Sequence, residues 1–203
     1  MRSTDLGFVH RYIEGSDPTT LLLLHGTGGN EDDLLPLGKR LLPDAHLLSP
    51  RGKVLENGMP RFFRRLAMGV FDIEDLKTQT HALAEFIDEA AQRYDLDRDE
   101  IIAVGYSNGA NIAASLLLLH PHLLRRAGLL HAMLPFEPDV PPDLSQTSVL
   151  LTGARRDPYI SPEQTEALGD LLRACGAQLT MEWQPAGHEL TPAEVEALSD
   201  WIS

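Results

Sequence analysis

The stretch "IIAVGYSNGANIAASLLLLH", residues 101–120, joins two apolar runs through a serine that stands between two glycines. The first run, residues 101–105, has the length of a buried strand, and the second is long enough for a helix. Where a strand turns tightly into a helix, the two backbones nearly touch, so the neighbouring positions must lack side chains. The sequence therefore predicts a strand, a sharp turn and a helix, with Ser107 in a strained conformation at the turn.

Apolar runs elsewhere predict further strands, and amphipathic segments between them predict helices. The expected strands are Thr20–His25, Ala45–Ser49 and Ser148–Thr152, with weaker candidates at Phe8–Glu14, Ala127–His131 and Gln178–Gln184. Ile73–Tyr94 carries the apolar stripe of an amphipathic helix. Asn30 with Asp33 is expected to cap a helix in "LLPLGKRLL", and Ser161 and Thr191 begin capping boxes followed by proline. This alternation favours an α/β fold with a mostly parallel sheet covered on both faces.

Length and composition limit what the chain can be. Its 203 residues are expected to form a single domain, 1–203, and a net charge of −13 argues against nucleic acid or an anionic membrane as a partner. One cysteine, Cys175, excludes an intrachain disulfide. The N-terminal residues lack the apolar core of a signal peptide, and the apolar runs are too short to span a bilayer, so a cytoplasmic protein without stable membrane association is expected. A homodimer is left open.

Three residues at strand ends have the types and the order of a catalytic triad. A serine hydroxyl needs a base to take its proton, and the base needs a carboxylate to orient it. Asp157 follows the strand "SVLLT", and His188 follows "QLTMEWQ", which gives the order Ser107, Asp157, His188. The alternatives are that Asp157 begins a turn before proline and that His188 is an exposed loop residue. His131 also ends a strand, but it precedes Asp157, so we assign it to the pocket wall.

A glycine-rich turn supplies the second half of the catalytic interpretation. In His25-Gly26-Thr27-Gly28-Gly29, the backbone N–H of Thr27 can face the oxygen of a tetrahedral intermediate, together with the N–H of Asn108. The alternative is a glycine-rich connection without a catalytic role. We expect His25 to be structural. No spacing of His, Cys or Asp resembles a metal site and no phosphate loop is present, so neither a metal nor a cofactor is expected.

These motifs together resemble the α/β-hydrolase superfamily, over nearly the whole chain. The segments "LLLLHGTGGNEDDLLPLGKRL", "GYSNGAN", "GARRDP" and "GH" are similar to its phospholipase/carboxylesterase branch, which includes acyl-protein thioesterases. Residues 49–76 are closer still to small bacterial MhqD-like esterases. The resemblance implies a cofactor-free serine hydrolase with Ser107, Asp157 and His188 as triad. It also implies Thr27 and Asn108 as oxyanion donors, and a minimal lid.

The chain departs from the branch in two places that bear on the substrate. Asn108 stands where the branch often has a small residue or Gln, and "LLHAMLPF" brings His131 and Met133 towards the pocket. Residues 50–72 are either a packing connection or a loop over the site. In the second case Phe62, Met68 and Phe71 are expected to line an acyl or aromatic pocket, and Arg51 and Arg61 to hold the loop or meet a substrate carboxylate.

The favoured function is a serine carboxylesterase that hydrolyses small soluble carboxylic esters through an acyl-enzyme. The alternatives are an acyl-thioesterase or lysophospholipase on the same triad, and a binding protein on a hydrolase scaffold. The presence of all three triad residues speaks against the binding protein.

Overall fold

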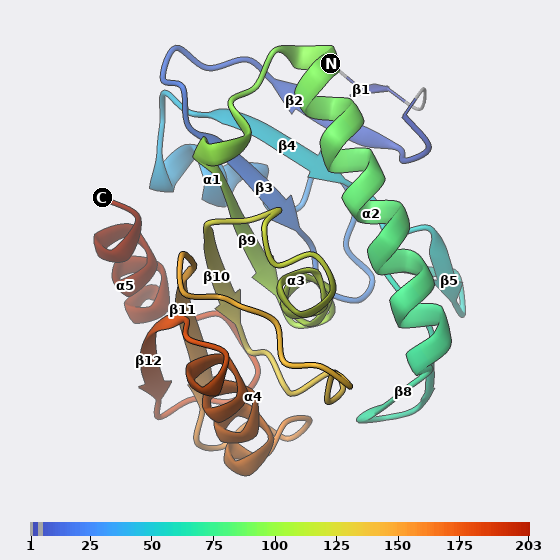
Figure 1. Ribbon diagram of the computed structural model, residues 1–203, viewed down its shortest axis with the longest axis vertical. Coiled ribbons are helices and arrows are strands. Elements are labelled where there is room, and N and C mark those ends of the chain that lie inside the picture. Colours follow the sequence, from blue (N-terminus) through green and yellow to red (C-terminus); the bar gives the residue numbers. More distant parts are fainter. Residues whose placement is uncertain (1, 4–5) are drawn as a thin grey trace.

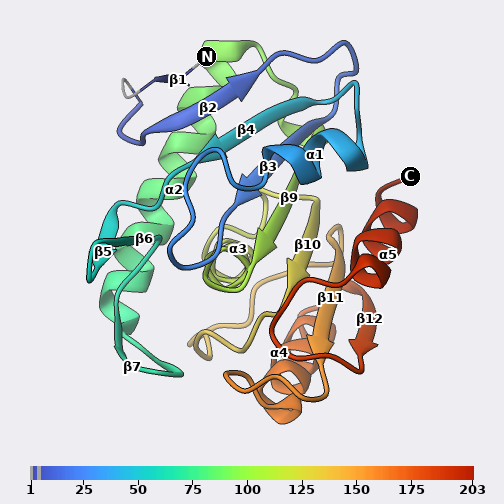
Figure 2. The same cartoon turned by 180° about the vertical axis from the view of Figure 1, so that it is seen from behind.

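The computed structural model, which describes residues 2–3 and 6–203, has one large twisted sheet between two layers of helices (Figures 1 and 2). Within the described residues, the strand order is β1-β2-β4-β3-β9-β10-β11-β12. The six strands β4, β3, β9, β10, β11 and β12 are parallel to one another, whereas β1 and β2 are antiparallel to their neighbours. The bounds are Arg2–Ser3 for β1, His10–Ile13 for β2, Thr20–Leu24 for β3, His46–Pro50 for β4, Ile101–Tyr106 for β9, Arg126–Leu130 for β10, Ser148–Ala154 for β11 and Gln178–Gln184 for β12. The predicted strands are thus confirmed to within two residues at each end.

Helices cover both faces of the sheet, as the alternation of strands and helices predicts. One layer holds α2 (Ile73–Tyr94), α3 (Asn108–Leu119) and α4 (Pro162–Ala174), and the other holds α1 (Leu35–Leu41) and α5 (Pro192–Ile202). In the part of the chain that the structure describes, none of the helices combines the length and the hydropathy that crossing a bilayer requires.

The core lies on both sides of the sheet because successive side chains of a strand point to opposite faces. In β3, Leu22 and Leu24 face the layer of α2 and α3, whereas Leu21 and Leu23 face the layer of α1 and α5. All four side chains are fully buried. A strand buried on both faces reads as a continuous apolar run, which is the pattern that predicted it.

The helix starts are only partly as expected. Thr191 and Ser161 begin capping boxes at α5 and α4, and these predictions are confirmed. The predicted cap of α1 is wrong, because the N-cap residue is Leu34, which makes no side-chain cap hydrogen bond. The Asn30 side chain instead accepts the N–H of Asp32 at 2.8 Å, in a turn that precedes the helix.

The segment between β4 and α2 forms two short hairpins beside α2. The first consists of β5 (Val54–Glu56) and β6 (Met59–Arg61), and the second of β7 (Arg65–Ala67) and β8 (Val70–Phe71). Figure 2 shows both hairpins along one flank of α2. These hairpins, rather than an irregular loop, supply one wall of the pocket described below.

Candidate active site

Ser107 occupies the turn between β9 and α3 in a backbone conformation that is rare for a residue with a side chain. Its φ is +53°, in the region that glycine favours. A Cβ atom at Gly105 would lie 2.6 Å from the Gly109 carbonyl oxygen, and one at Gly109 would overlap the Leu24 carbonyl group. Both glycines of the motif are therefore required by the close approach of strand and helix.

The three predicted triad residues meet at the carboxyl ends of β9, β11 and β12. The Ser107 hydroxyl donates to His188 Nε2 at 2.8 Å, and His188 Nδ1 donates to Asp157 Oδ2 at 2.6 Å. The Asp157 side chain is 2% exposed and that of His188 is 18% exposed, so the imidazole lies at the boundary between core and pocket. This chain of hydrogen bonds is the arrangement that activates a serine nucleophile.

Backbone groups and a tyrosine fix the position of the carboxylate and the imidazole. Asp157 Oδ1 accepts the N–H groups of Tyr159 at 2.8 Å and Ile160 at 3.2 Å. Burial opposes the charged carboxylate, but the hydrogen bonds from His188 and Tyr159 outweigh it, so the pKa of Asp157 is lowered. The Tyr106 hydroxyl donates to the His188 carbonyl oxygen at 2.5 Å, which anchors the loop that carries the histidine.

His131 lies behind the triad and not in the pocket, so its assignment to the pocket wall is wrong. It is 1% exposed, and its Nδ1 donates to the same Asp157 oxygen at 3.2 Å. Its Nε2 lies 2.9 Å from Glu194 Oε1, within ion-pair distance but outside hydrogen-bond alignment. Burial disfavours the imidazolium, but the two carboxylates outweigh burial and raise the pKa of His131. The ring also contacts those of His188 and Tyr106.

Glu194 completes this buried network from α5. Its side chain has no exposed surface, and its Oε1 also accepts the Thr152 hydroxyl at 2.8 Å. Its Oε2 accepts the Thr191 N–H at 2.9 Å, which is half of the capping box. Burial opposes its charge, but the contact with His131 and the Thr191 N–H lower the pKa of Glu194. The sequence signal for Glu194 was only a helix cap, so its contact with His131, which in turn contacts Asp157, was missed.

His131, Asp157 and His188 could be taken for metal ligands, because their ligand atoms lie within 4.8 Å of one another. Zinc bonds of about 2.0–2.2 Å hold neighbouring ligand atoms about 3 Å apart or more. The 2.6 Å separation of His188 Nδ1 and Asp157 Oδ2 is shorter and is that of a charge-assisted hydrogen bond. The group fits a proton-transfer site better than a metal centre.

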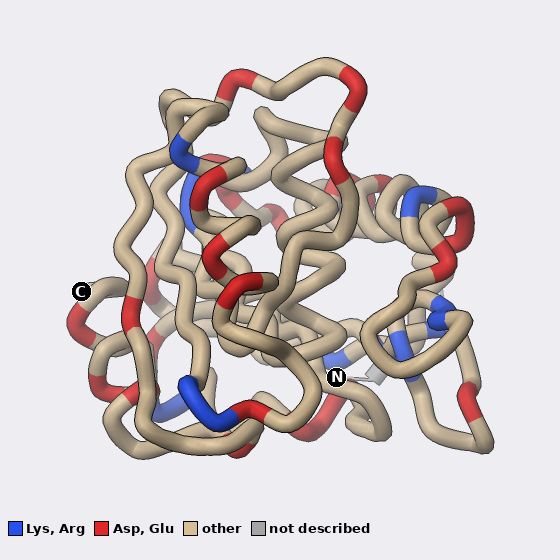
Figure 3. The backbone as a smooth tube through the Cα atoms, turned by 90° about the horizontal axis from the view of Figure 1, so that it is seen from below, with Lys and Arg blue, Asp and Glu red and all other residues tan. Residues whose placement is uncertain are grey.

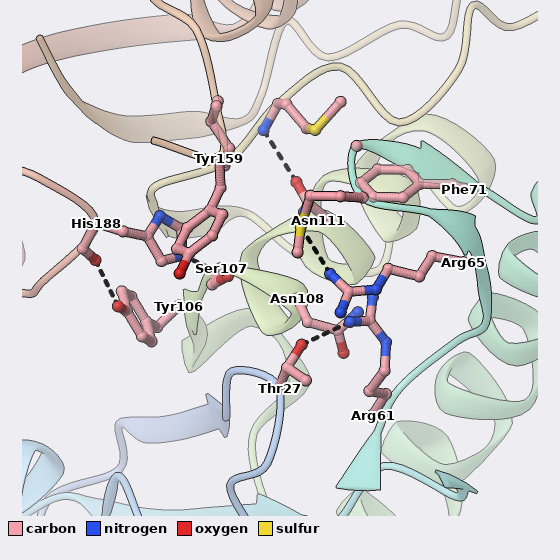
Figure 4. Close-up of a pocket in the computed structure, with 14 residues that line it drawn as sticks. Thr27, Arg61, Arg65, Phe71, Tyr106, Ser107, Asn108, Asn111, Tyr159 and His188 are labelled. Atoms are coloured by element: carbon pink, nitrogen blue, oxygen red, sulfur yellow. Dashed lines mark hydrogen bonds between the residues drawn. The ribbon is translucent and has the colours of Figure 1, made fainter. Parts of the chain in front are cut away.

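A pocket of about 310 Å³ opens beside Ser107 and brings together residues from six parts of the chain (Figure 4). Thr27 and Asn108, the predicted oxyanion donors, both line it. Asn108 is the first residue of α3, and the first N–H groups of a helix have no acceptor within it. The other lining residues are Arg61, Arg65, Met68, Gly69, Phe71, Tyr106, Ser107, Asn111, Met133, Tyr159, Ile160 and His188.

The predicted pocket residues divide into those that line the pocket and those that support it. Met68, Phe71 and Met133 are among the lining residues, whereas Phe62 is not. Phe62 is 1% exposed because its ring packs on His25, with ring centres 4.8 Å apart. Its N–H donates to Asn108 Oδ1 at 2.7 Å, so Phe62 holds the residue after the serine from behind.

Arg51 and His25 also lie outside the pocket. Arg51 Nη2 donates to Glu31 at 2.7 Å, and it is Arg61 that reaches the pocket. His25 Nε2 accepts the Gly52 N–H at 3.0 Å, so the expectation of a structural role for His25 is confirmed. Lining residues that the sequence did not indicate are Arg65, Gly69, Tyr106, Asn111, Tyr159 and Ile160. Of these, only Tyr106, inside the glycine–serine motif, carried a usable signal.

The parallel sheet, its two helical layers and a serine between strand and helix define an α/β-hydrolase fold. Residues 13–203 match the model of the phospholipase/carboxylesterase family, and the chain belongs to that family. It is 50% identical over 192 residues to the protein MhqD of Bacillus subtilis, covering 95% of this chain and 96% of MhqD.

Solved structures agree with this assignment. The Bacillus cereus carboxylesterase is 50% identical with a TM-score of 0.94, and the match covers 96% of this chain and 93% of that enzyme. A carboxylesterase from Mesorhizobium loti is 33% identical with a TM-score of 0.93, over 100% of this chain and 97% of that one. The chain is thus a member of a hydrolase family whose solved relatives include carboxylesterases.

Proposed function

We propose that the protein is a serine carboxylesterase that hydrolyses small soluble carboxylic esters through an acyl-enzyme. The observation that carries the proposal is the hydrogen-bonded series Ser107–His188–Asp157, with distances of 2.8 Å and 2.6 Å, at the edge of a pocket. The family and its carboxylesterase relatives support the same reaction class. A cytoplasmic location is also part of the proposal.

The proposed reaction has two halves that use the same groups. His188 Nε2 takes the proton of Ser107 as the Oγ atom bonds to the ester carbonyl carbon. The carbonyl oxygen becomes an oxyanion that the N–H groups of Thr27 and Asn108 stabilise, each donor contributing about 3–4 kcal/mol. The C–O bond to the alcohol then breaks, and His188 gives its proton to the leaving oxygen. Water repeats these steps on the acyl-enzyme, which releases the acid and restores Ser107.

The size of the pocket favours short acyl groups. A cavity of about 310 Å³ lies at the lower end of the volumes of ordinary ligand sites, which favours a small ester over one with a fatty acyl chain. Rates for p-nitrophenyl esters from acetate to palmitate should therefore be highest for short chains. A maximum at long chains would contradict the small-ester proposal and favour a lysophospholipase or acyl-thioesterase.

The decisive test is the hydrolysis of p-nitrophenyl butyrate by the wild type and by Ser107→Ala. The variant should lose activity by about 10⁴-fold or more, because the nucleophile is gone. Ser115→Ala is a matched control on the same helix, since Ser115 is buried against Thr80 and does not line the pocket. A fluorophosphonate probe should label the wild type and Ser115→Ala but not Ser107→Ala. Full activity of Ser107→Ala would overturn the proposal.

A further inference from the structure

Two arginines line the pocket beside Ser107, although the chain as a whole is strongly acidic. The net charge is −13, and Figure 3 shows acidic positions in many parts of the backbone. Among the described residues that line the pocket are Arg61 and Arg65, but no aspartate or glutamate. The positive charge of the pocket is therefore local and differs in sign from the rest of the molecule.

One carboxylate, that of Glu56, serves both guanidinium groups. Arg65 Nη2 donates to Glu56 Oε1 at 2.6 Å, and Arg61 Nε lies 3.3 Å from Glu56 Oε2. Two positive charges facing one negative charge leave a net positive charge. Burial and the positive charge of Arg65 both disfavour the protonated guanidinium of Arg61. Together they outweigh the attraction of the Glu56 carboxylate and lower the pKa of Arg61 to about 10. The guanidinium still carries its charge at neutral pH, in a place where a further anion would stabilise it.

The two guanidinium groups are held in place next to the proposed oxyanion site. Arg61 is 3% exposed, and its Nη1 donates to Thr27 Oγ1 at 2.7 Å while its Nε donates to the Phe63 carbonyl oxygen at 3.1 Å. Figure 4 shows Arg61 and Arg65 side by side, close to Thr27 and Asn108. Such fixed donors lose little conformational freedom when a ligand binds.

Arg65 has a donor that a ligand could use. Its Nη1 donates to Met68 Sδ at 3.0 Å, and a thioether is a weak acceptor that a carboxylate oxygen would replace favourably. Met68 lies on the exposed turn of the β7–β8 hairpin, with 56% of its surface exposed, so it can move aside.

We propose that Arg61 and Arg65 form a subsite for an anionic group, so that the preferred substrates are small esters that carry a carboxylate. The apolar side chains of Phe71, Met133 and Ile160 would contact the short hydrocarbon between the scissile ester and that carboxylate. This inference rests on the proposed esterase function and specifies its substrate class. The carboxylate can belong to the acid part or to the alcohol part of the ester, and two pairs of substrates distinguish these cases.

Each pair consists of a charged ester and an uncharged one of the same shape. Monoethyl glutarate carries the carboxylate on the acid part, and ethyl 5-methylhexanoate replaces it by an isopropyl group. 3-(Butanoyloxy)propanoate carries it on the alcohol part, and 3-methylbutyl butanoate is its uncharged counterpart. For at least one pair, kcat/KM measured in a pH-stat at pH 7.5 should be about tenfold or more higher for the charged ester, as a charge-assisted hydrogen bond implies.

Two substitutions should change this preference in opposite directions. Arg65→Gln removes one positive charge and should lower the ratio of charged to uncharged kcat/KM by about tenfold. Glu56→Gln removes the competing carboxylate and should raise that ratio. Arg64→Gln is the matched control, because Arg64 is in the same segment but pairs with Asp72, with 61% of its side chain exposed. The ratio for Arg64→Gln should equal that of the wild type.

The outcomes separate the subsite from the esterase itself. If the wild type hydrolyses the uncharged ester of each pair at least as well as the charged one, the anionic subsite is wrong while the esterase proposal stands. If Arg65→Gln and Glu56→Gln lower activity on both esters equally, Glu56 and Arg65 only fix the hairpin and the subsite is also wrong. If no ester is hydrolysed and the fluorophosphonate does not label Ser107, the esterase proposal itself has failed.

Discussion

Replacing Glu194 with glutamine tests whether His131 carries a buried positive charge behind the triad. The side chains of both residues are fully buried, and His131 Nε2 lies 2.9 Å from Glu194 Oε1. Glutamine has nearly the same shape and can serve in a capping box, so the hydrogen bond with the Thr191 N–H can persist. The substitution therefore removes mainly the charge.

The size of the effect follows from the burial of the pair. Removing one member of a buried ion pair costs about 3–5 kcal/mol of unfolding free energy. His131 can release its proton when its partner is lost, and it still faces Asp157, so we expect the lower end, about 3 kcal/mol.

The cost should depend on pH in a direction that the pKa values of the two groups determine. The pKa of His131 is raised in the folded protein. The stability that protonated His131 gives to the fold is therefore complete below its pKa in the unfolded chain, 6.5, and is lost as the pH rises through its pKa in the folded protein. The pKa of Glu194 is lowered in the folded protein. The stability that ionised Glu194 gives to the fold is therefore present above its pKa in the unfolded chain, 4.5, and is lost as the pH falls through its pKa in the folded protein. The full cost should therefore be seen near pH 5.5, and a smaller one at pH 9.5.

Urea unfolding followed by circular dichroism at these two pH values measures the difference. Glu196→Gln, an exposed position on the same helix, is the control and should change stability by less than about 0.5 kcal/mol at either pH. An equal cost of Glu194→Gln at pH 5.5 and 9.5 would refute the ion pair and leave Glu194 with packing and its hydrogen bonds to Thr152 and Thr191.

Two further substitutions test the carboxylate that orients His188 and the glycine that allows the turn at Ser107. Asp157→Asn should lower kcat for p-nitrophenyl butyrate by about 10⁴-fold, because an amide does not hold the imidazole in the required tautomer; activity within tenfold of wild type would show that Asp157 does not orient His188. Gly109→Ala should cost more than about 3 kcal/mol or prevent folding, because the new methyl group overlaps the Leu24 carbonyl group. Gly169→Ala, on α4 with ordinary contacts from 3.4 Å, is the control, and comparable urea midpoints for the two alanine variants would contradict the steric argument.

The sequence was sufficient for the features that depend on local pattern. Fully buried strands such as β3 can be recognised as continuous apolar runs. The glycines around Ser107 indicate a tight turn, because a side chain at either position would collide with the backbone. The order of Asp157 and His188 after successive strands was enough to predict that they meet at one edge of the sheet, since parallel strands end on the same side.

Features that depend on side-chain direction could not be predicted in this way. Phe62 and Met68 belong to one segment, but only Met68 reaches the pocket, because the ring of Phe62, in the connection between the two hairpins, lies in the core. His131 was placed on the wrong side of the triad for the same reason. Its ring is buried behind Asp157, and its backbone has a φ of +55°; no sequence pattern indicated either feature.

The positive φ of Ser107 has a consequence for how this chain could change over generations. A non-glycine residue in such a conformation costs about 1–3 kcal/mol, which the packing of β9 against α3 must offset. Glycine would adopt the same turn without that cost. Selection for stability alone would therefore favour replacement of Ser107 by glycine. The serine persists only where selection acts on the chemistry of its hydroxyl.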